Sequence, residues 1–177
     1  MIFNKNVSLL SLKLENANDL STLANNKRVW DNLRDYMPFP YTLEDAQTFI
    51  EANKDLDPPL AFGIHFQNDF CGVIGINQMK DVYSHSAEIG YWLGEPFWGQ
   101  GIMSEAVSLM IKHCFNELNI IRICTGVFDY NKASVKVLEK NGFEYEGSFK
   151  LGVQKNGKLV DELRYGLINP KHLQLSK

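Results

Sequence analysis

The spacing of apolar and polar positions predicts a chain that alternates between strands and helices. Short apolar runs bounded by turn residues are typical of strands, and they occupy residues 7–14, 60–66, 70–79, 87–93, 122–128, 143–149 and 159–167. Apolar residues spaced by three or four positions are typical of helices. We expect helices at residues 16–30, from 42 through 50, after 101 and at 132–140.

Turn and capping residues support these boundaries. The segments 67–69 and 156–157 each separate two strand runs and predict hairpins, the second through its Asn-Gly pair. Thr42 and Asp45 have the spacing of a capping box, whereas the prolines and aromatic residues at 36–41 exclude regular structure there. The helix after Gly101 is expected to bury one apolar stripe, formed by Val107, Met110, Ile111, Cys114 and Leu118.

The predicted order of elements is β-α-α-β-β-β-α-β-α-β-β. Such an order is typical of an α/β (α+β) fold in which helices cover the faces of a mixed, mostly antiparallel sheet. A chain of 177 residues without a repeat or a linker fits one domain, so we expect residues 1–177 to form a single domain.

Composition and charge exclude several classes of protein. The chain is 45% hydrophobic and 22% charged with a net charge of −3, and it has no basic cluster, so we expect no nucleic-acid partner. No apolar run approaches the about 18 residues of a membrane span, and the start lacks a signal-peptide pattern, so we expect a cytoplasmic protein without membrane contact. An odd number of cysteines without CxxC spacing predicts neither disulfides nor a zinc site, and the cysteines are Cys71, Cys114 and Cys124.

The segment 94–104 carries the main candidate chemistry. It places a Gly-x-Gly sequence between a strand and a long helix, but it lacks the Gly-Lys-Ser/Thr of a P-loop and the third glycine of a dinucleotide site. Gly99 and Gly101 remove side-chain bulk where the helix amides point outward, and a helix N-terminus attracts a pyrophosphate. The alternative is a tight turn that binds nothing.

Four blocks of the sequence have a recognisable order and spacing, and they are Ala87–Leu93, Phe97–Ala106, Asn131–Ser134 and Leu138–Phe143. With these blocks the sequence resembles the GNAT acetyltransferase superfamily, and within it the Rim-type branch that acetylates the N-termini of ribosomal proteins. The segment Pro38–Thr42, followed by Asp45-Ala46, also resembles that branch.

The resemblance implies a GNAT-like acyl-CoA N-acyltransferase fold in which a central pair of strands splays apart to hold acetyl-CoA, with no metal. The family's pyrophosphate motif, Gln/Arg-x-x-Gly-x-Gly/Ala, has Trp98, Gly101 and Met103 at its defining positions here. The residues expected to contact the cofactor are Tyr91, Trp92, Leu93, Trp98, Gly99, Gln100, Gly101, Ile102, Met103, Ser104, Asn131 and Ser134. Asn131 alternatively caps the helix that follows, and Ser134 alternatively stabilises its first turn.

The resemblance also implies direct attack of an amine on the thioester. The general base expected is Glu88, whose alternative role is a salt bridge. In many relatives a tyrosine acts as the general acid that protonates the leaving thiolate, and this chain has Leu138 at that position. Either Ser134 or Tyr130 is then expected to protonate the thiolate, or the thiolate leaves unassisted. An acceptor pocket is expected from Arg34, Phe39 and Tyr41, with aromatic packing under a loop as the alternative.

The acceptor is the least specified part of the prediction. The Rim-type blocks favour a protein N-terminal α-amine, of the ribosomal-protein type, on a monomeric or homodimeric enzyme. A small amine such as a polyamine or an aminoglycoside is the first alternative, because residues 142–167 resemble polyamine acetyltransferases as well. The second alternative is a sensor that binds acyl-CoA without catalysis, which the leucine at the tyrosine position would suit.

Overall fold

The computed structural model describes residues 2–4 and 6–175, and these divide into two compact units. Unit 1 comprises Met1–Gly75 and Tyr91–Leu109, and unit 2 comprises Ile76–Gly90 and Met110–Lys177. Two strands and one helix contribute residues to both units. The single domain expected for residues 1–177 stays a prediction.

Unit 1 is built on antiparallel strands that follow one another in sequence and in space, in the order β1-β2-β3-β4-β5. Within this unit the amide of Gly94 donates to the carbonyl of Cys71 at 2.8 Å, which joins the end of β5 to β4. The strands are β1 (Ile2–Asn4), β2 (Val7–Ser11), β3 (Ala61–Phe66), β4 (Asp69–Gln78) and β5 (Ser86–Leu93).

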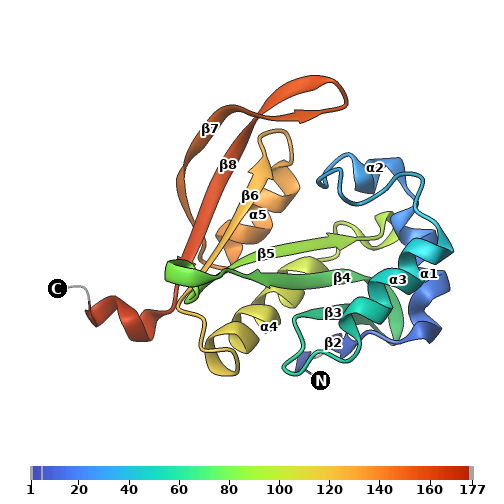
Figure 1. Ribbon diagram of the computed structural model, residues 1–177, viewed down its shortest axis with the longest axis horizontal. Coiled ribbons are helices and arrows are strands. Elements are labelled where there is room, and N and C mark those ends of the chain that lie inside the picture. Colours follow the sequence, from blue (N-terminus) through green and yellow to red (C-terminus); the bar gives the residue numbers. More distant parts are fainter. Residues whose placement is uncertain (1, 5, 176–177) are drawn as a thin grey trace. The chain divides into compact units, whose positions relative to one another are not determined.

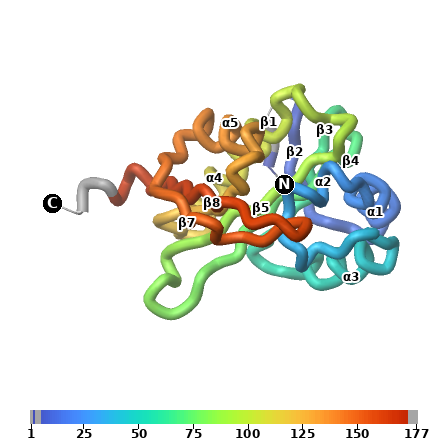
Figure 2. The backbone as a smooth tube through the Cα atoms, turned by 90° about the horizontal axis from the view of Figure 1, so that it is seen from above, coloured from blue at the N-terminus to red at the C-terminus, as the bar shows by residue number. Residues whose placement is uncertain are grey.

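The helices of unit 1 pack on these strands through small and branched apolar side chains. Helices α1 (Ala17–Ala24) and α3 (Leu43–Asn53) lie side by side (Figure 1 and Figure 2). The cluster that they bury consists of Leu12, Ala17, Leu20, Ala24, Tyr41, Ala46, Ile50, Ala61, Phe70 and Val73. Its burial is the main stabilising term available to this unit.

The predicted helix over residues 16–30 is wrong in its continuity. It is divided at Asn25-Asn26 into α1 and a short helix α2 (Lys27–Trp30). The Asn26 side chain accepts a hydrogen bond from the amide of Arg28 at 2.8 Å and thereby caps α2. The capping box predicted for α3 is confirmed, because Thr42 accepts from the amide of Asp45 and the Asp45 carboxylate accepts from the amide of Thr42.

Unit 2 contains the parallel part of the sheet. Strand β6 (Arg122–Phe128) pairs in parallel with β5 and antiparallel with β8 (Lys158–Ile168), which pairs with β7 (Glu144–Lys155). The β7–β8 hairpin turns at Asn156-Gly157, where both residues have positive φ, as the sequence predicts. Strand β7 lies at the edge of the sheet, and its register with β8 shifts between Tyr145 and Gly147 and again between Phe149 and Val153.

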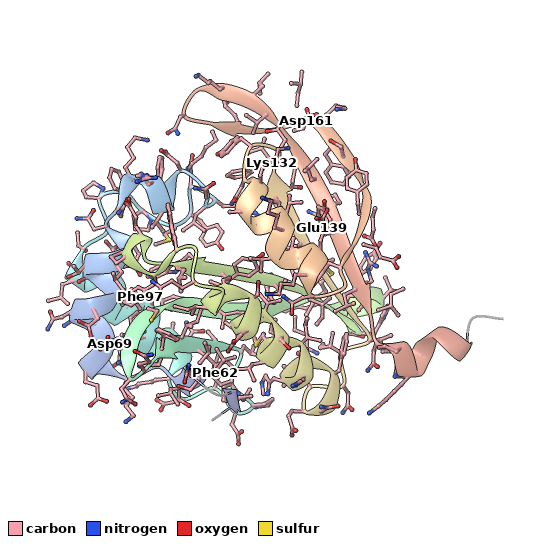
Figure 3. The ribbon with its side chains drawn as sticks, turned by 180° about the vertical axis from the view of Figure 1, so that it is seen from behind. Phe62, Asp69, Phe97, Lys132, Glu139 and Asp161 are labelled. Atoms are coloured by element: carbon pink, nitrogen blue, oxygen red, sulfur yellow. The ribbon has the colours of Figure 1, made fainter. Side chains whose placement is uncertain are left out.

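Helix α5 (Lys132–Lys140) packs on one face of the β6–β8 pair. The Tyr165 hydroxyl donates to the Glu139 carboxylate at 3.4 Å, and Gly142, which ends the helix with a φ of +81°, lies beside Leu167. Lys132 and Glu139 mark the two ends of this helix in Figure 3. Helix α4 (Ile102–Asn116) begins in unit 1 and ends in unit 2. Val107, Met110 and Cys114 of its predicted stripe are fully buried, whereas Ile111 is only partly buried and Leu118 lies beyond the end of the helix.

Short 3₁₀ turns complete the chain: η1 (Leu14–Asn16), η2 (Asp81–Tyr83), η3 (Glu95–Phe97) and η4 (Pro170–Leu175). Among the described residues, no helix combines the length and the apolar character that crossing a membrane requires.

Candidate active site

The glycine loop of unit 1 joins the end of β5 to the start of α4. It contains the turn η3, whose last residue Phe97 is labelled in Figure 3, followed by Gly99 and Gly101 with φ values of +75° and +79°. Residues that carry a Cβ atom rarely adopt this left-handed backbone conformation, so the path of the backbone favours glycine at both positions. A Cβ atom at either position would have no heavy atom within 4 Å. The space above both glycines is therefore open.

The first turn of α4 follows directly after the two glycines. The amide of Glu105 donates to the carbonyl of Gly101 at 3.2 Å, so Gly101 is the residue at which helical bonding begins. The amides of residues 102–104 therefore precede the first helical hydrogen bond, and the helix dipole adds partial positive charge. Ile102 and Met103 are buried, with 1% and 9% of their surface exposed. The Met103 side chain therefore does not cover the amides.

Trp98 is fixed by contacts on two sides. Its indole N–H donates to the carbonyl of Leu93 at 2.7 Å, and the guanidinium of Arg28 on α2 lies 5.4 Å from the ring centroid. Arg28 also forms an ion pair with Glu95, whose carboxylate accepts from the Asn26 side chain at 2.8 Å. Gln100 donates to the carbonyl of Pro96 at 3.1 Å.

These contacts of Asn26, Arg28 and Glu95 were missed from the sequence. Helix α2 lies 67 residues from the loop in the chain, and no local pattern connects the two. The sequence offered one hint, because residues 94–104 contain no lysine or arginine, and a cation beside this loop must therefore come from another segment of the chain.

At the end of β5, Tyr91 and Trp92 are partly buried and Leu93 is buried. Trp92 packs against the hydrophobic cluster of unit 1. A Cβ atom on Gly72 of β4 would lie 2.3 Å from the carbonyl oxygen of Trp92, so the two backbones approach closely only because residue 72 is glycine. The side chain of Trp92 thus has a packing role, and cofactor contact by residues 91–93 stays a prediction.

Glu88 lies in unit 2, where the parallel pairing of β5 with β6 ends. The registers run from Ser86 opposite Arg122 to Glu88 opposite Cys124, although β5 continues to Leu93. Gly90 follows Glu88 on the same face of the strand, and a Cβ atom there would have no heavy atom within 4 Å. The partly buried side chain of Glu88 therefore lies on the same face of β5 as this open space at Gly90.

Two further ion pairs lie on this side of the sheet of unit 2, and no sequence pattern indicated them. Arg122 pairs with Glu146, and a Cβ atom on Gly166 would clash with both side chains. Arg164 pairs with Glu162 at 3.0 Å, and a Cβ atom on Gly126 would clash with both of these side chains. The two glycines leave room for the pairs to lie flat on the strands.

At the start of α5, the alternative role of Asn131 is confirmed. Its side chain accepts a hydrogen bond from the amide of Ser134 at 3.1 Å, which caps the helix. Tyr130 is 44% exposed and its ring lies 5.7 Å from that of Phe128. Leu138 is fully buried. It stays a prediction that Asn131 and Ser134 contact a cofactor. It also stays a prediction that Tyr130 or Ser134 acts as a general acid.

The residues nominated for an acceptor pocket in unit 1 differ in their burial. Tyr41 is 7% exposed and belongs to the hydrophobic cluster, and burial beside Asp45 raises its pKa to about 12. Phe39 packs on Trp30 with ring centroids 5.4 Å apart, and Arg34 is exposed. The packing alternative therefore describes Tyr41, while acceptor binding by Arg34 and Phe39 stays a prediction.

The cysteines have the properties of core residues. All three are free and buried, and burial raises the pKa of Cys71 to about 11 and that of Cys114 to about 12. Burial also raises the pKa of Cys124, against the opposing influence of Arg164 and Arg122. Thiols with raised pKa values are poor nucleophiles at neutral pH, which favours direct transfer over an acetyl-cysteine intermediate.

We predict that the native protein resists thiol alkylation. Iodoacetamide at pH 8 should label the native chain at least about tenfold more slowly than the urea-unfolded chain, in which the thiols have pKa values near 8.5. Intact-mass spectrometry over time measures both rates. Rapid stoichiometric labelling of one native cysteine would reopen the question of a covalent intermediate.

Among residues 2–4 and 6–175, no group of three His, Cys, Asp or Glu side chains is arranged to hold a metal ion. The candidate features are the glycine loop before α4 in unit 1, and Glu88 on β5 and the capped helix α5 in unit 2.

Comparison with known proteins assigns these features to one class. Residues 6–144 match the family described as Acetyltransferase (GNAT) domain. Since this match covers more than half of the chain, the protein belongs to the GNAT acetyltransferase family and is an acetyl-CoA-dependent N-acetyltransferase. The family resemblance and the predicted mixed fold are both confirmed.

Individual relatives agree with this assignment. The chain is 35% identical over 135 residues to the probable N-acetyltransferase YjcK of Bacillus subtilis, covering 73% of this chain and 75% of that protein. It is similar to the structure of RimL, a ribosomal L7/L12 α-N-protein acetyltransferase in complex with coenzyme A (28% identity, TM-score 0.83, coverage 93% and 95%). It is also similar to the structure of the microcin C7 self-immunity acetyltransferase MccE in complex with acetyl-CoA and AMP (28% identity, TM-score 0.81, coverage 94% of each chain).

Proposed function

We propose that this enzyme transfers the acetyl group of acetyl-CoA to the α-amino group at the N-terminus of a protein of the ribosomal type, in the cytoplasm. The observation that carries the proposal is the similarity to RimL over 93% of the chain, because RimL is an α-N-protein acetyltransferase. The N-terminal blocks at residues 38–46, which resemble the Rim-type branch, support the same acceptor.

In unit 1, the proposed site for the cofactor diphosphate is the glycine loop. Backbone amides of residues 102–104 donate to phosphate oxygens, and the positive end of the α4 dipole adds attraction. The positive φ values of Gly99 and Gly101 keep this approach free of side chains. Acetyl-CoA supplies an activated acyl group as a thioester.

In unit 2, the proposed general base is Glu88. A protein α-amine has a pKa near 7.7–8.0, so a substantial fraction is already neutral at cytoplasmic pH and the base has little to do before attack. When the amine nitrogen bonds to the acyl carbon it becomes cationic, and Glu88 accepts the proton that it loses, directly or through water. The C–S bond then breaks and the electron pair leaves on sulfur.

The departing thiolate is protonated by Ser134 or Tyr130, or it leaves without help. Leu138 occupies the position where many relatives have an acidic tyrosine, and its buried hydrocarbon side chain donates no proton. Tyr130 is exposed and bears a phenol, so it has the proton that the step requires.

The proposal is tested by incubating the protein with acetyl-CoA and peptides that begin with serine or alanine. We expect release of free coenzyme A thiol and a mass increase of one acetyl group on the peptide N-terminus. A peptide with a blocked N-terminus and an internal lysine is the control, because a lysine amine has a pKa near 10.4 and is mostly charged. Acetylation of spermidine or an aminoglycoside, with none of the peptides, would assign a small-molecule acceptor in place of the proposed one.

A further inference from the structure

The loop that is proposed to bind a diphosphate has an unfavourable charge of its own. Between residues 94 and 104, Glu95 is the only charged side chain, and it is negative. Coenzyme A carries several negative charges on its diphosphate and ribose phosphate. The outward amides of α4 and its dipole offset part of this repulsion, but a cation near the loop would offset much more.

Arg28 supplies such a cation from a different part of unit 1. Its guanidinium lies over the Trp98 ring at 5.4 Å and forms an ion pair with Glu95, which cancels the negative charge of the loop. A planar guanidinium has five N–H donors, so a pairing with one carboxylate leaves donors for a phosphate.

The position of Arg28 is fixed by Asn26. The Asn26 side chain accepts from the amide of Arg28 at 2.8 Å through its oxygen and donates to Glu95 at 2.8 Å through its nitrogen. One asparagine thus caps α2 and joins that helix to the loop. Trp98 is held from the other side by its bond to the carbonyl of Leu93.

The indole N–H of Trp98 already donates to the carbonyl of Leu93, so this side chain has no donor left for a phosphate. The guanidinium of Arg28, which lies over the Trp98 ring, has such donors. We propose that Arg28 is a phosphate-binding residue of this enzyme and contacts a phosphate group of acetyl-CoA. This inference rests on the proposed binding of acetyl-CoA at the glycine loop.

The alternative role for Arg28 is purely structural, as a clamp between α2 and the loop through Glu95. The two roles predict opposite results for Glu95→Gln. If Arg28 binds phosphate, removing the competing carboxylate leaves affinity for coenzyme A unchanged or higher. If Arg28 is a clamp, breaking its ion pair lowers that affinity as much as replacing Arg28 does.

Lys27 offers a matched control on the same helix. Its ammonium pairs with Asp31 and lies 5.4 Å from the centroid of the Trp30 ring, so it has the same kinds of contact as Arg28 but with a different tryptophan. Lys27→Gln removes the same unit of positive charge from α2 without touching Trp98 or Glu95.

The test is titration calorimetry of the wild type, Arg28→Gln, Glu95→Gln and Lys27→Gln with coenzyme A and with pantetheine, which lacks all the phosphates. We expect Arg28→Gln to weaken coenzyme A binding by about tenfold or more, to leave pantetheine binding unchanged, and to reduce the salt dependence of coenzyme A binding. Lys27→Gln and Glu95→Gln should bind coenzyme A at least about as well as the wild type.

Three results would overturn the inference: equal affinities of Arg28→Gln and Lys27→Gln for coenzyme A, a loss by Glu95→Gln as large as that by Arg28→Gln, or an equal loss with pantetheine. Circular dichroism and thermal melting of each variant verify that it is folded. Failure of the wild type itself to bind coenzyme A would instead count against the proposed function, so the two failures are distinguishable.

Discussion

Replacing Gly101 by valine should weaken the binding of acetyl-CoA by at least about 100-fold. The valine side chain would enter the open space above the loop, where a Cβ atom has no heavy atom of the protein within 4 Å and where the diphosphate is proposed to bind. The φ of +79° at this residue is also unfavourable for a β-branched side chain, so the loop would shift. Losing two charge-assisted hydrogen bonds at about 1.5–3 kcal/mol each weakens binding by at least about 100-fold.

Gly157→Val is the control for backbone strain. Gly157 has a φ of +72°, and a Cβ atom there would also have no heavy atom within 4 Å, but the residue lies in the β7–β8 turn. Both variants should lose about 1–2 kcal/mol of stability to the left-handed backbone, measured by urea unfolding. Only Gly101→Val should lose affinity in calorimetry. Equal affinities in the two variants would mean that the cofactor does not approach Gly101.

Replacing Glu88 by glutamine should lower kcat by about 10²–10⁴-fold at pH 7, the usual contribution of a general base. Glutamine has nearly the same shape as glutamate but does not accept a proton. Acetyl-CoA affinity should not change, because the proposed phosphate-binding groups belong to the glycine loop. The loss should shrink as the pH rises above 8, where the α-amine of the acceptor is already neutral and solvent hydroxide accepts the proton.

The matched control for this carboxylate is Glu144→Gln on β7. Glu144 is an exposed glutamate on another strand of unit 2, opposite Gly166. Steady-state kinetics of both variants between pH 6 and 9 with a serine-initiated peptide separate their effects. Kinetics of Glu88→Gln that match those of Glu144→Gln at every pH would remove Glu88 from the mechanism.

Elements with strong local signals were predicted correctly from the sequence. Strand β6 at 122–128 and helix α5 at 132–140 have the expected bounds, because an apolar run, an N-cap and a terminal glycine each act within a few residues. The Asn156-Gly157 hairpin is correct for the same reason, although β7 is longer than residues 143–149 and reaches Lys155.

Features that depend on distant contacts were not predictable. The break at Asn25-Asn26 follows from long-range bonds, since Asn25 accepts from the amide of Tyr41 at 3.1 Å and Asn26 donates to Glu95. Helix periodicity across residues 16–30 carries no information about either partner. The candidate site shows the same limit, because the glycine loop was recognisable in sequence whereas its neighbouring arginine was not.

The interrupted register of β7 has a consequence for how the protein behaves at high concentration. Tyr145, Phe149 and Leu151 on this edge strand are each more than half exposed, and a regular strand with such residues would be a template for association with other chains. The bulges bend the strand and break its row of hydrogen-bonding groups, and Leu151 has a φ of +51° that no extended partner can match. The irregular edge thus protects the folded enzyme against aggregation.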